Sequence, residues 1–409
     1  MLLELADLAP RVRNLLSILF TEWTVVGVGV ALVLSVLGSR MRARTAREAL
    51  GLGASLAILV WFASPAVAAG WVVYAVAFWV AVELVRPRWI AAPTVVVLLV
   101  AQIFLPIVAG GALGDRGRHG REFTAFATNM AFLRFHAYAW DRWRRDGRRL
   151  PLGRFLLATL FFPTFVNGPV EAPERFAEAS LAPAPPTFTA GVGRVVGGIV
   201  KLTIAGLAFE PGWTRVLAEG PHAPAHSIWL WGMLLYAWFY LSFSAWSDVA
   251  IGLSALLGHR VPENFDRPWL ATDPADFWRR WHVSFGVWLR DYVYVPLGGK
   301  RRHRALNVLV VFVVSAAWHV WGSLKLLGLG YFPVRAWGGF FVWGLLNAIG
   351  VVASRPLDRM VPATSGGVRI VRCVATFLFA SLCWIPFFLP SSVSLDAGLT
   401  MLLRMVWPF

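Results

Sequence analysis

Cysteine and acidic side chains are scarce in this chain of 409 residues, which has two cysteines and 22 Asp and Glu residues. Both cysteines, Cys373 and Cys383, fall in one apolar run, so we read them as small core side chains and not as a disulfide or a metal pair. Charged residues are only 15% of the chain, against 58% hydrophobic residues. This composition excludes an ordinary soluble protein and indicates a polytopic membrane protein.

Basic residues outnumber acidic ones and give the chain a formal net charge of +16. They stand in short clusters between apolar runs, at Arg40–Arg47, Arg142–Arg149 and Lys300–Arg304. A positive-inside bias explains such clusters, so we expect cytoplasmic loops there, in contact with anionic headgroups of the lipid bilayer or with anionic cytoplasmic molecules. Nucleic acid is not an expected partner. The first residues carry acids and lack a basic n-region, so no cleaved signal peptide is expected.

Apolar runs close to the length of a bilayer recur along the chain and predict an all-α fold with roughly ten or eleven hydrophobic helices. The run at 227–257 is long enough for a kinked helix or a helix pair. No boundary indicates a separate soluble domain, so residues 1–409 are expected to form a single membrane-embedded domain. The predicted elements are residues 23–38, 50–64, 66–84, 90–110, 123–140, 153–170, 190–209, 227–257, 305–324, 336–354 and 368–390.

One histidine, His319, is the only ionisable side chain in the apolar stretch 305–324. A charged group at such depth costs on the order of 2.5 kcal/mol or more, so an ionisable side chain there usually faces a cavity or a protein partner. The alternative is a packing histidine that bonds a carbonyl group on a neighbouring helix. His319 is therefore a candidate for chemistry inside the membrane.

A second unusual segment runs from Asp273 to Arg302. Asp273 can cap a helix with Pro274 at its first position, so a helix is expected to start there. At about 100° per residue, one narrow aromatic stripe forms on this helix, with His282 beside it and two arginines opposite. The mixture of aromatic and charged residues predicts a short tilted or re-entrant helix that lines a funnel on the cytoplasmic side. The stripe consists of Phe277, Trp281, Phe285 and Trp288, and the opposite arginines are Arg279 and Arg290.

Two further blocks interrupt apolar runs. Asp248 lies inside one of them, and a buried carboxylate needs a partner, for which Arg279, Arg280 and Arg290 are candidates. A structural ion pair is the alternative to a chemical role for Asp248. The block FFPTFVNGPV at 161–170 contains Pro163, Gly168 and Pro169, and it predicts a broken helix beside a pocket.

Four strings in this sequence, SDVAIGL, PENFDRPW, DFWRRWHVSFGVWLRDYVYVPLGG and AAWH, resemble the membrane-bound O-acyltransferase superfamily. The resemblance runs from about Phe161 to Trp384, the expected reactive core, and is strongest to the branch of alginate O-acetylases and teichoic acid D-alanine transferases. The strings FLRFHAYAWDRWRRDG and SLKLLGLGYFPVRAWGG depart from the usual pattern of that branch. These departures leave the acceptor and the outer wall of the tunnel open.

The resemblance implies a helical body around a central tunnel, in a bacterial inner or plasma membrane. Through this tunnel an acyl group passes from a cytoplasmic thioester to a hydroxyl group. His319 corresponds to the essential histidine and His282 to a second functional position. The donor substrate is acyl-CoA or an acyl-phosphopantetheine carrier protein, with no permanently bound cofactor. The implied acceptor is an extracytoplasmic polysaccharide or cell-envelope glycan, and a separate extracytoplasmic acyltransferase is the suggested partner.

The residue types fit this chemistry. Attack of a hydroxyl group on a thioester needs a base, and a neutral imidazole is suited because its pKa lies near the working pH. His282, Trp318 or a backbone amide can donate to the developing oxyanion, and arginines can hold the donor's phosphates. No metal is required. The candidate catalytic residues are His319 and His282, and the candidate substrate-binding residues are Trp318, Trp278, Arg279, Arg280, Asp248, Arg290 and Tyr294.

Other functions stay open at this point. Within the same class, the chain could transfer D-alanine from a carrier protein or acylate a small molecule or lipid. A proton-coupled transporter or flippase could use His319 and Asp248 as a proton relay. A membrane scaffold without catalysis is a third class, and it predicts that His319 can be replaced without effect.

Overall fold

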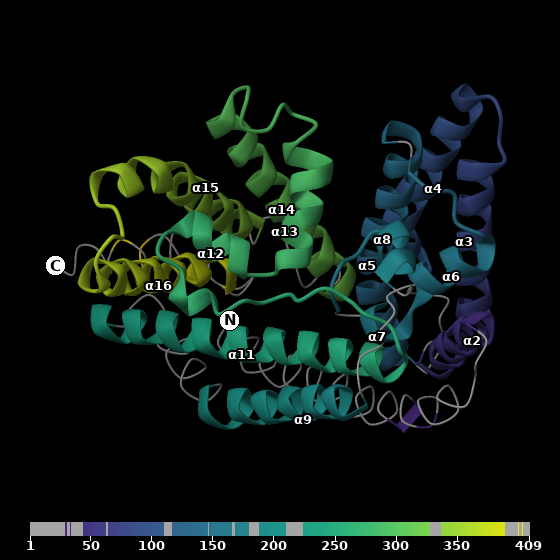
Figure 1. Cartoon of the computed structure of the whole chain (residues 1–409), viewed down its shortest axis with the longest axis horizontal. Coiled ribbons are helices and arrows are strands. Elements are labelled where there is room, and N and C mark those ends of the chain that lie inside the picture. Colours follow the sequence, from purple (N-terminus) through teal and green to yellow (C-terminus); the bar gives the residue numbers. More distant parts are fainter. Residues whose placement is uncertain are drawn as a thin grey trace. The chain divides into compact units, whose positions relative to one another are not determined.

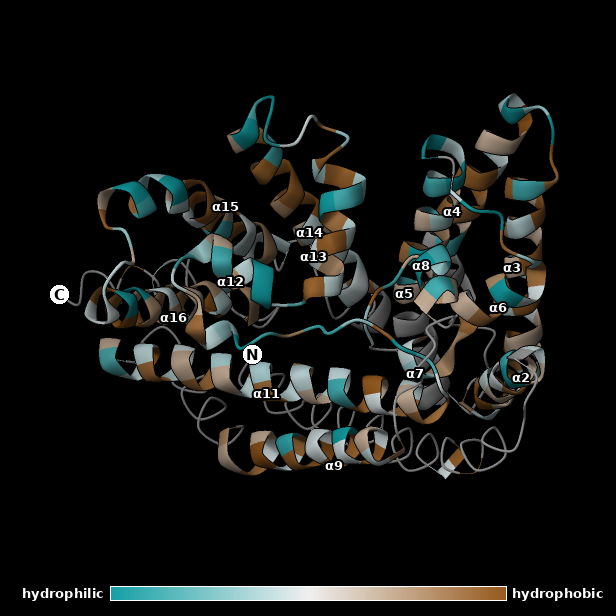
Figure 2. Cartoon of the chain, viewed as in Figure 1, coloured by the Kyte–Doolittle hydropathy of each residue, from teal (hydrophilic) through white to brown (hydrophobic). Residues whose placement is uncertain are grey.

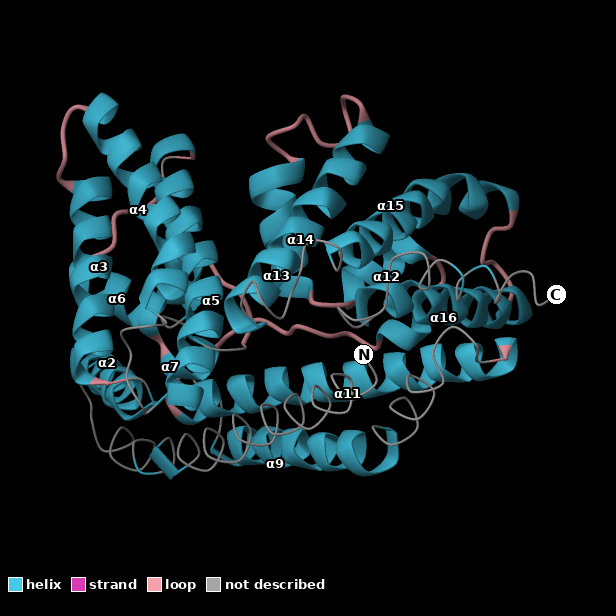
Figure 3. Cartoon of the chain, turned by 180° about the vertical axis from the view of Figure 1, so that it is seen from behind, coloured by secondary structure: helices cyan, strands magenta, loops and turns pink. Residues whose placement is uncertain are grey.

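The structure is a computed structural model that describes residues 44–62, 64–109, 117–145, 147–165, 168–179, 188–209, 224–327 and 337–388, with residues 29, 30, 33, 400 and 403. Within these ranges the chain forms helices and connecting loops, and no strand (Figure 3). The prediction of an all-α fold is confirmed. Most of the predicted element at 23–38 lies outside the described residues.

Seven helices in the described part are long and apolar enough to cross a membrane, so the chain is a multi-pass membrane protein. Hydrophobic residues recur along their surfaces in Figure 2. The run at 227–257 forms one helix of 32 residues, α11, and not a helix pair. The seven are α2 (Arg44–Phe62), α3 (Pro65–Glu83), α9 (Phe188–Ile204) continued by η1 (Ala205–Phe209), α11 (Ala225–Leu256), α14 (Arg304–Leu327), α15 (Trp337–Met360) and α16 (Gly366–Phe388).

The chain divides into two compact units. Unit 1 consists of Met1–Val12, Ile199–Ala245 and Glu263–Phe409, and unit 2 of Arg13–Gly198 and Trp246–Pro262. Long helices occur in both, so neither unit is a soluble appendage. The single domain and the central tunnel that the sequence suggests stay predictions.

Unit 2 contains α2 and α3, five further helices, the beginning of α9 and the end of α11 (Figure 1). Its core is aromatic: the ring centroids of Phe78 and Phe135 lie 4.8 Å apart, and those of Tyr138 and Phe155 lie 4.7 Å apart. The proline-containing block forms a broken helix, as predicted, since α6 ends before Phe161 and a short helix follows. The five helices are α4 (Arg88–Ala109), α5 (Gly117–Arg144), α6 (Leu152–Leu160), α7 (Phe162–Phe165) and α8 (Pro173–Ala179).

Arg134, on α5, holds this broken helix in place. Its guanidinium Nη2 donates to the carbonyl and hydroxyl oxygens of Thr164, each at 2.6 Å, and its Nη1 donates to the carbonyl oxygen of Thr159 at 3.3 Å. Arg134 is only 2% exposed, so these acceptors replace water around a buried cation. They also satisfy carbonyl groups that the helix break leaves without intrahelical partners.

Glu174, on α8, is 8% exposed, and neither carboxylate oxygen has a hydrogen-bond partner on another described residue. Burial raises the pKa of Glu174 to about 8, and nearby Asp141 and Glu83 act in the same direction while Arg142 opposes them. The folded state therefore binds more protons than the unfolded state between the unfolded value near 4.5 and about 8. The protonated carboxyl of Glu174 contributes to the stability of the fold. This contribution is fully present below pH 4.5 and is lost as the pH rises through about 8.

We expect Glu174→Gln to match the native chain in thermal stability at pH 5 and to melt at a higher temperature at pH 9. Glutamine keeps the size and polarity of the protonated acid and cannot ionise. The measurement is thermal unfolding of the detergent-solubilised protein at pH 5, 7 and 9, with Glu178→Gln as control. An identical loss of stability with pH in the native chain and in Glu174→Gln would contradict the assignment.

Unit 1 contains the beginning of α11, the helices α14 to α16, and a series of short elements between them. α15 packs along both α14 and α16 (Figure 1). A Cβ atom at Gly344 of α15 would lie 3.1 Å from the carbonyl oxygen of Phe312 of α14, so glycine permits a close approach of the two backbones. The short elements are η3 (Pro268–Leu270), α12 (Pro274–Arg280), α13 (Val283–Leu289) and η4 (Arg290–Tyr294).

The two cysteines of unit 1 differ in their surroundings. Cys383 is 1% exposed and belongs to the core, as expected. Cys373 is only partly buried, and its thiol Sγ lies 3.3 Å from the carbonyl oxygen of Leu270. The reading of Cys373 as a core residue is therefore wrong, because its side chain lies against the backbone of η3 and stays partly accessible.

The helix expected from Asp273 onward starts as predicted but is interrupted. The carboxylate of Asp273 accepts from the amide of Asp276 at 2.8 Å, with Pro274 in the first turn. The helix ends at Arg280, and His282 takes a left-handed conformation with φ of 45° before α13 begins. The prediction of one continuous helix is wrong.

The extended segment around Asn264–Asp266, called here the Asn264 strip, causes this break. Its backbone forms hydrogen bonds with groups that would otherwise bond within the helix. The amide of Asp266 donates to the carbonyl of Arg280, and the amide of Val283 donates to the carbonyl of Asn264, both at 2.9 Å. The aromatic stripe is correspondingly divided into two stacked pairs. These are Phe277 with Trp281, 5.5 Å apart, and Phe285 with Trp288, 6.2 Å apart.

Candidate active site

His319 lies on α14 and is half-buried. Its Nδ1 is 2.6 Å from the carbonyl oxygen of Ser315, one turn earlier on the same helix. A carbonyl oxygen can only accept, so Nδ1 carries the hydrogen, and in the neutral ring Nε2 keeps a lone pair. Four aromatic rings surround the imidazole, at centroid distances of 5.0 Å for Phe387, 5.6 Å for Trp343, 6.1 Å for Phe340 and 6.3 Å for Phe285.

His282, at the break between α12 and α13, is oriented by a buried amide. Its Nδ1 lies 3.1 Å from Oδ1 of Asn264, and the same oxygen accepts from the amide of Ser284 at 3.3 Å and from its hydroxyl at 2.6 Å. Because a backbone N–H must donate, Oδ1 is an acceptor and the hydrogen is on Nδ1 of His282. His282 and His319 thus share one tautomer, with Nε2 available as a proton acceptor.

The structure brings the two histidines to one aromatic ring. The Phe285 ring centroid is 5.2 Å from that of His282 and 6.3 Å from that of His319. Burial lowers the pKa of His282 to about 3, and the proximity of His319 acts in the same direction. His282 is therefore neutral at physiological pH and can accept a proton or a hydrogen bond at Nε2.

Two of the predicted tryptophans lie near this pair. The Trp318 ring is 6.1 Å from that of Phe285. The Trp278 ring is 5.6 Å from that of Trp343, and its indole Nε1 donates to Oδ1 of Asn347 at 3.0 Å. The hydrogen-bonding group of Trp278 is thus used within the protein, and its role in substrate binding stays a prediction.

The predicted arginines take part in ion pairs. Arg279 and Arg280 both contact the carboxylate of Asp276, at 3.2 and 3.0 Å, and Arg290 contacts Asp291 at 2.8 Å. Arg279 and Arg290 remain exposed, so an anionic group can still reach them. Tyr294 ends η4 and, within the described residues, makes no ring contact with either histidine. The part of these four residues in substrate binding stays a prediction.

Asp248 lies in unit 2, where the guanidinium Nε of Arg194 is 2.7 Å from its carboxylate. The expectation that an arginine of the 279–290 segment pairs with Asp248 is wrong. Arg279, Arg280 and Arg290 form ion pairs with nearby acids in their own segment. Asp248 thus takes part in an ion pair, as the structural alternative predicts. Its assignment to substrate binding stays a prediction.

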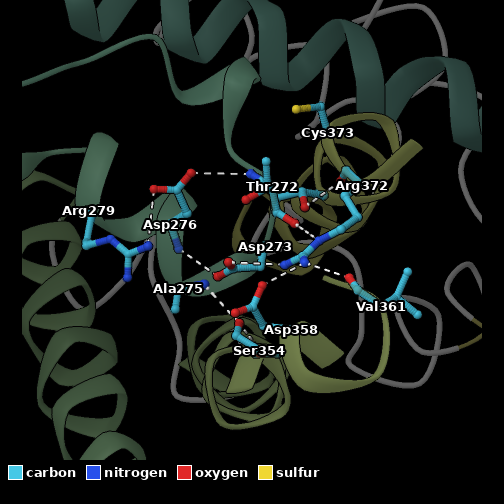
Figure 4. Close-up of polar contacts among 12 residues, drawn as sticks. Thr272, Asp273, Ala275, Asp276, Arg279, Ser354, Asp358, Val361, Arg372 and Cys373 are labelled. Carbon is cyan, nitrogen blue, oxygen red and sulfur yellow. Dashed lines mark hydrogen bonds and ion pairs between the residues drawn. The ribbon is translucent and has the colours of Figure 1, made fainter. Parts of the chain in front are cut away.

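The start of α12 is fixed by Arg372 of α16, as Figure 4 shows. Arg372 is 5% exposed; its Nε donates to the carbonyl oxygen of Thr272 at 2.9 Å, and its Nη2 lies 3.5 Å from the carboxylate of Asp273. Its Nη1 donates to Asp358 at 2.8 Å and to the carbonyl of Val361 at 2.9 Å, at the end of α15. This cluster joins α12, α15 and α16.

We expect Arg372→Ala to lower the free energy of unfolding of unit 1 by on the order of 3–5 kcal/mol, because it leaves Asp273 and buried carbonyl groups without their partner. Arg372→Lys should recover only part of the loss, since lysine cannot donate in a planar fork. The measurement is thermal unfolding in detergent, with the exposed Arg369→Ala on the same helix as control. Equal stability of Arg372→Ala and Arg369→Ala would show that Arg372 does not hold the three helices together.

Some residues of this site were not anticipated. Asn264 was not singled out, although it lies within the PENFDRPW string, where an asparagine before an aromatic residue gives no sign of its distant partner. Trp343 and Phe387 come from α15 and α16 and reach His319 only through helix packing. Their apolar surroundings in the sequence carry no signal that distinguishes them from core residues.

Comparison with known proteins gives three relevant relatives. A probable alginate O-acetylase of Azotobacter vinelandii is 29% identical over 203 residues, which cover 49% of this chain and 37% of the relative. A peptidoglycan O-acetyltransferase of Helicobacter pylori is 30% identical over 182 residues, covering 44% and 31%. A teichoic acid D-alanyltransferase of Bacillus subtilis is 26% identical over 239 residues, covering 54% and 56%. The chain thus spans between about a third and about half of the length of these relatives.

The membrane-bound O-acyltransferase family matches residues 67–332, well over half of the chain. The matched region contains both histidines, the Asn264 strip, and the helices α12 and α13 on either side of the break at His282. The multi-pass helical fold and these sequence matches agree, and the chain belongs to the membrane-bound O-acyltransferase family.

Proposed function

We propose that this chain transfers an acyl group, in the first instance acetyl, from a cytoplasmic thioester to a hydroxyl group of an extracytoplasmic polysaccharide or cell-envelope glycan. The names of the relatives support the acceptor class, since they refer to alginate, peptidoglycan and teichoic acid. The observation that carries the proposal is the orientation of His319. Its Nδ1 is bound to the Ser315 carbonyl, so Nε2 is the free basic atom in an aromatic surrounding.

In the proposed reaction, the hydroxyl oxygen of the acceptor attacks the thioester carbonyl carbon. At the same time, Nε2 of His319 accepts the proton of that hydroxyl group. The Ser315 carbonyl stabilises the imidazolium that forms, because it accepts a hydrogen bond from Nδ1–H. The carbon–sulfur bond then breaks, the electron pair goes to sulfur, and the imidazolium returns the proton to give a thiol. His282, held by Asn264, orients the hydroxyl group or a bound water through its Nε2.

The donor is coenzyme A or a carrier protein with a phosphopantetheine arm, since both present a thioester next to phosphate groups. The exposed guanidinium groups of Arg279 and Arg290 suit such phosphates at the entrance. D-alanine transfer from a carrier protein is the second candidate. It is favoured by the share of the chain, 54%, that matches the D-alanyltransferase of Bacillus subtilis.

The test is thioester turnover by the purified protein in lipid nanodiscs. Radiolabelled acetyl-CoA and a D-alanyl carrier protein are compared as donors, with alginate, peptidoglycan fragments and teichoic acid as acceptors. Transfer of label to a glycan from acetyl-CoA supports the main proposal, and transfer from the carrier protein alone supports the second. Absence of covalent transfer from every donor would exclude both.

The transporter alternative depends on Asp248 as part of a proton relay. The Arg194 guanidinium lies 2.7 Å from this carboxylate, so Asp248 is already held in an ion pair within unit 2. No further observation favours transport, so acyl transfer is the better supported function.

A further inference from the structure

Several buried indole and hydroxyl groups in the described part of unit 1 have no hydrogen-bond partner. They include the Nε1 atoms of Trp231, Trp343 and Trp384 and the hydroxyl of Tyr236. Trp343 is only 2% exposed, and most buried donors in native proteins find an acceptor. An unpaired buried donor has an open hydrogen-bonding capacity that a ligand acceptor can fill, so its position relative to the candidate site decides whether it matters.

Trp343 is the one of these four that contacts a predicted catalytic residue. Its ring centroid is 5.6 Å from that of His319, with the ring planes at 68°. The ring is fixed on its other sides by Trp384, stacked at 5.9 Å, and by Phe387 at 5.2 Å. The indole ring of Trp343 is thus held in place beside the imidazole of the proposed base.

The nearest amide in the sequence does not satisfy this donor. Asn347, one turn further along α15, uses its Oδ1 to accept from Trp278 and its Nδ2 to donate to the carbonyl oxygen of Trp343 at 2.8 Å. Trp278 and Trp343 therefore lie side by side, with rings 5.6 Å apart, and differ in one respect. The N–H of Trp278 has a partner in the protein, and that of Trp343 has none among the residues that the structure describes.

We propose that the indole N–H of Trp343 donates a hydrogen bond to the thioester carbonyl oxygen and holds it as it becomes the oxyanion. This inference rests on the proposed acyl transfer. When the hydroxyl oxygen forms its bond to the carbonyl carbon, the π electrons of the carbonyl move to its oxygen, and His319 takes the hydroxyl proton. When the carbon–sulfur bond breaks, those electrons re-form the carbonyl, and sulfur leaves with the bonding pair and receives the proton. Trp343 is a catalytic residue in this scheme, and it exchanges no proton.

The test is Trp343→Phe, which keeps an aromatic ring and removes the N–H. Loss of one oxyanion donor lowers kcat by on the order of 10²–10³, and we expect that decrease with little change in KM for the donor. Thermal stability should fall to a similar extent in Trp343→Phe and in the control below, because each substitution removes part of a buried ring. The matched control is Trp231→Phe, which removes another unpaired buried indole N–H from a residue without ring contact to either histidine.

Each outcome decides the inference. A selective decrease in kcat in Trp343→Phe, with Trp231→Phe at the native rate, supports it. Native kcat in Trp343→Phe, an effect on KM alone, or an equal loss of kcat in Trp231→Phe overturns it, and in these cases acyl transfer by the native chain still stands. If the native chain transfers no acyl group, the proposed function fails first and the inference fails with it.

Discussion

Replacement of His319 by alanine is expected to lower the rate of acyl transfer by on the order of 10²–10⁴, the contribution of a well-placed general base. The effect should be on kcat, because the imidazole acts on a proton that moves only during the reaction. The measurement is transfer of label from the thioester to the acceptor in nanodiscs under saturating donor.

Two variants separate chemistry from folding in this experiment. His319→Gln keeps a polar side chain but cannot take up a proton at neutral pH, and we expect it to be as inactive as His319→Ala. His226→Ala removes an exposed imidazole at the start of α11 and should retain native activity. Native activity in His319→Ala would exclude the residue as the base.

Replacement of Asn264 by alanine is expected to reduce both stability and activity. Asn264 is fully buried, and its Oδ1 accepts from three donors on His282 and Ser284. Each donor left unsatisfied costs about 1–3 kcal/mol. Release of the His282 ring should lower kcat by about 10²-fold, the effect expected of a misplacement near 1 Å.

Asn264→Asp provides the conservative comparison, because a carboxylate accepts from the same three donors. We expect it to recover most of the thermal stability that Asn264→Ala loses. The negative charge raises the pKa of His282 from its value of about 3, so the acidic limb of the pH profile should move to higher pH. An unchanged profile, or equal instability of both variants, would argue against Asn264 as the residue that positions His282.

Local signals in the sequence predict the parts of this molecule that depend on local interactions. Apolar runs predict the long helices, and the Asp273 cap with Pro274 predicts where α12 begins. His319 is conspicuous because it is the only ionisable group in its run. Each of these features is determined by residues within one or two helical turns, which a single sequence displays.

The features that the sequence does not reveal depend on contacts between distant segments. The interruption at His282 arises because the strip around Asn264 binds the backbone there, and no glycine or proline marks the position. Arg194, and not an arginine of the 279–290 segment, pairs with Asp248, since helix packing decides which charges meet. The same holds for the role proposed for Trp343, since only the packing of α15 against α14 brings its ring beside His319.

The left-handed backbone at His282 has a consequence for genetic screens of this protein. Most residues pay about 1–2 kcal/mol to adopt this conformation, whereas Gly, Asn and Asp reach it more readily. A loss-of-function allele with a β-branched or bulky residue at this codon therefore combines a changed chain path with a missing imidazole. Asparagine isolates the missing ring, since it retains the ability to turn the chain between α12 and α13.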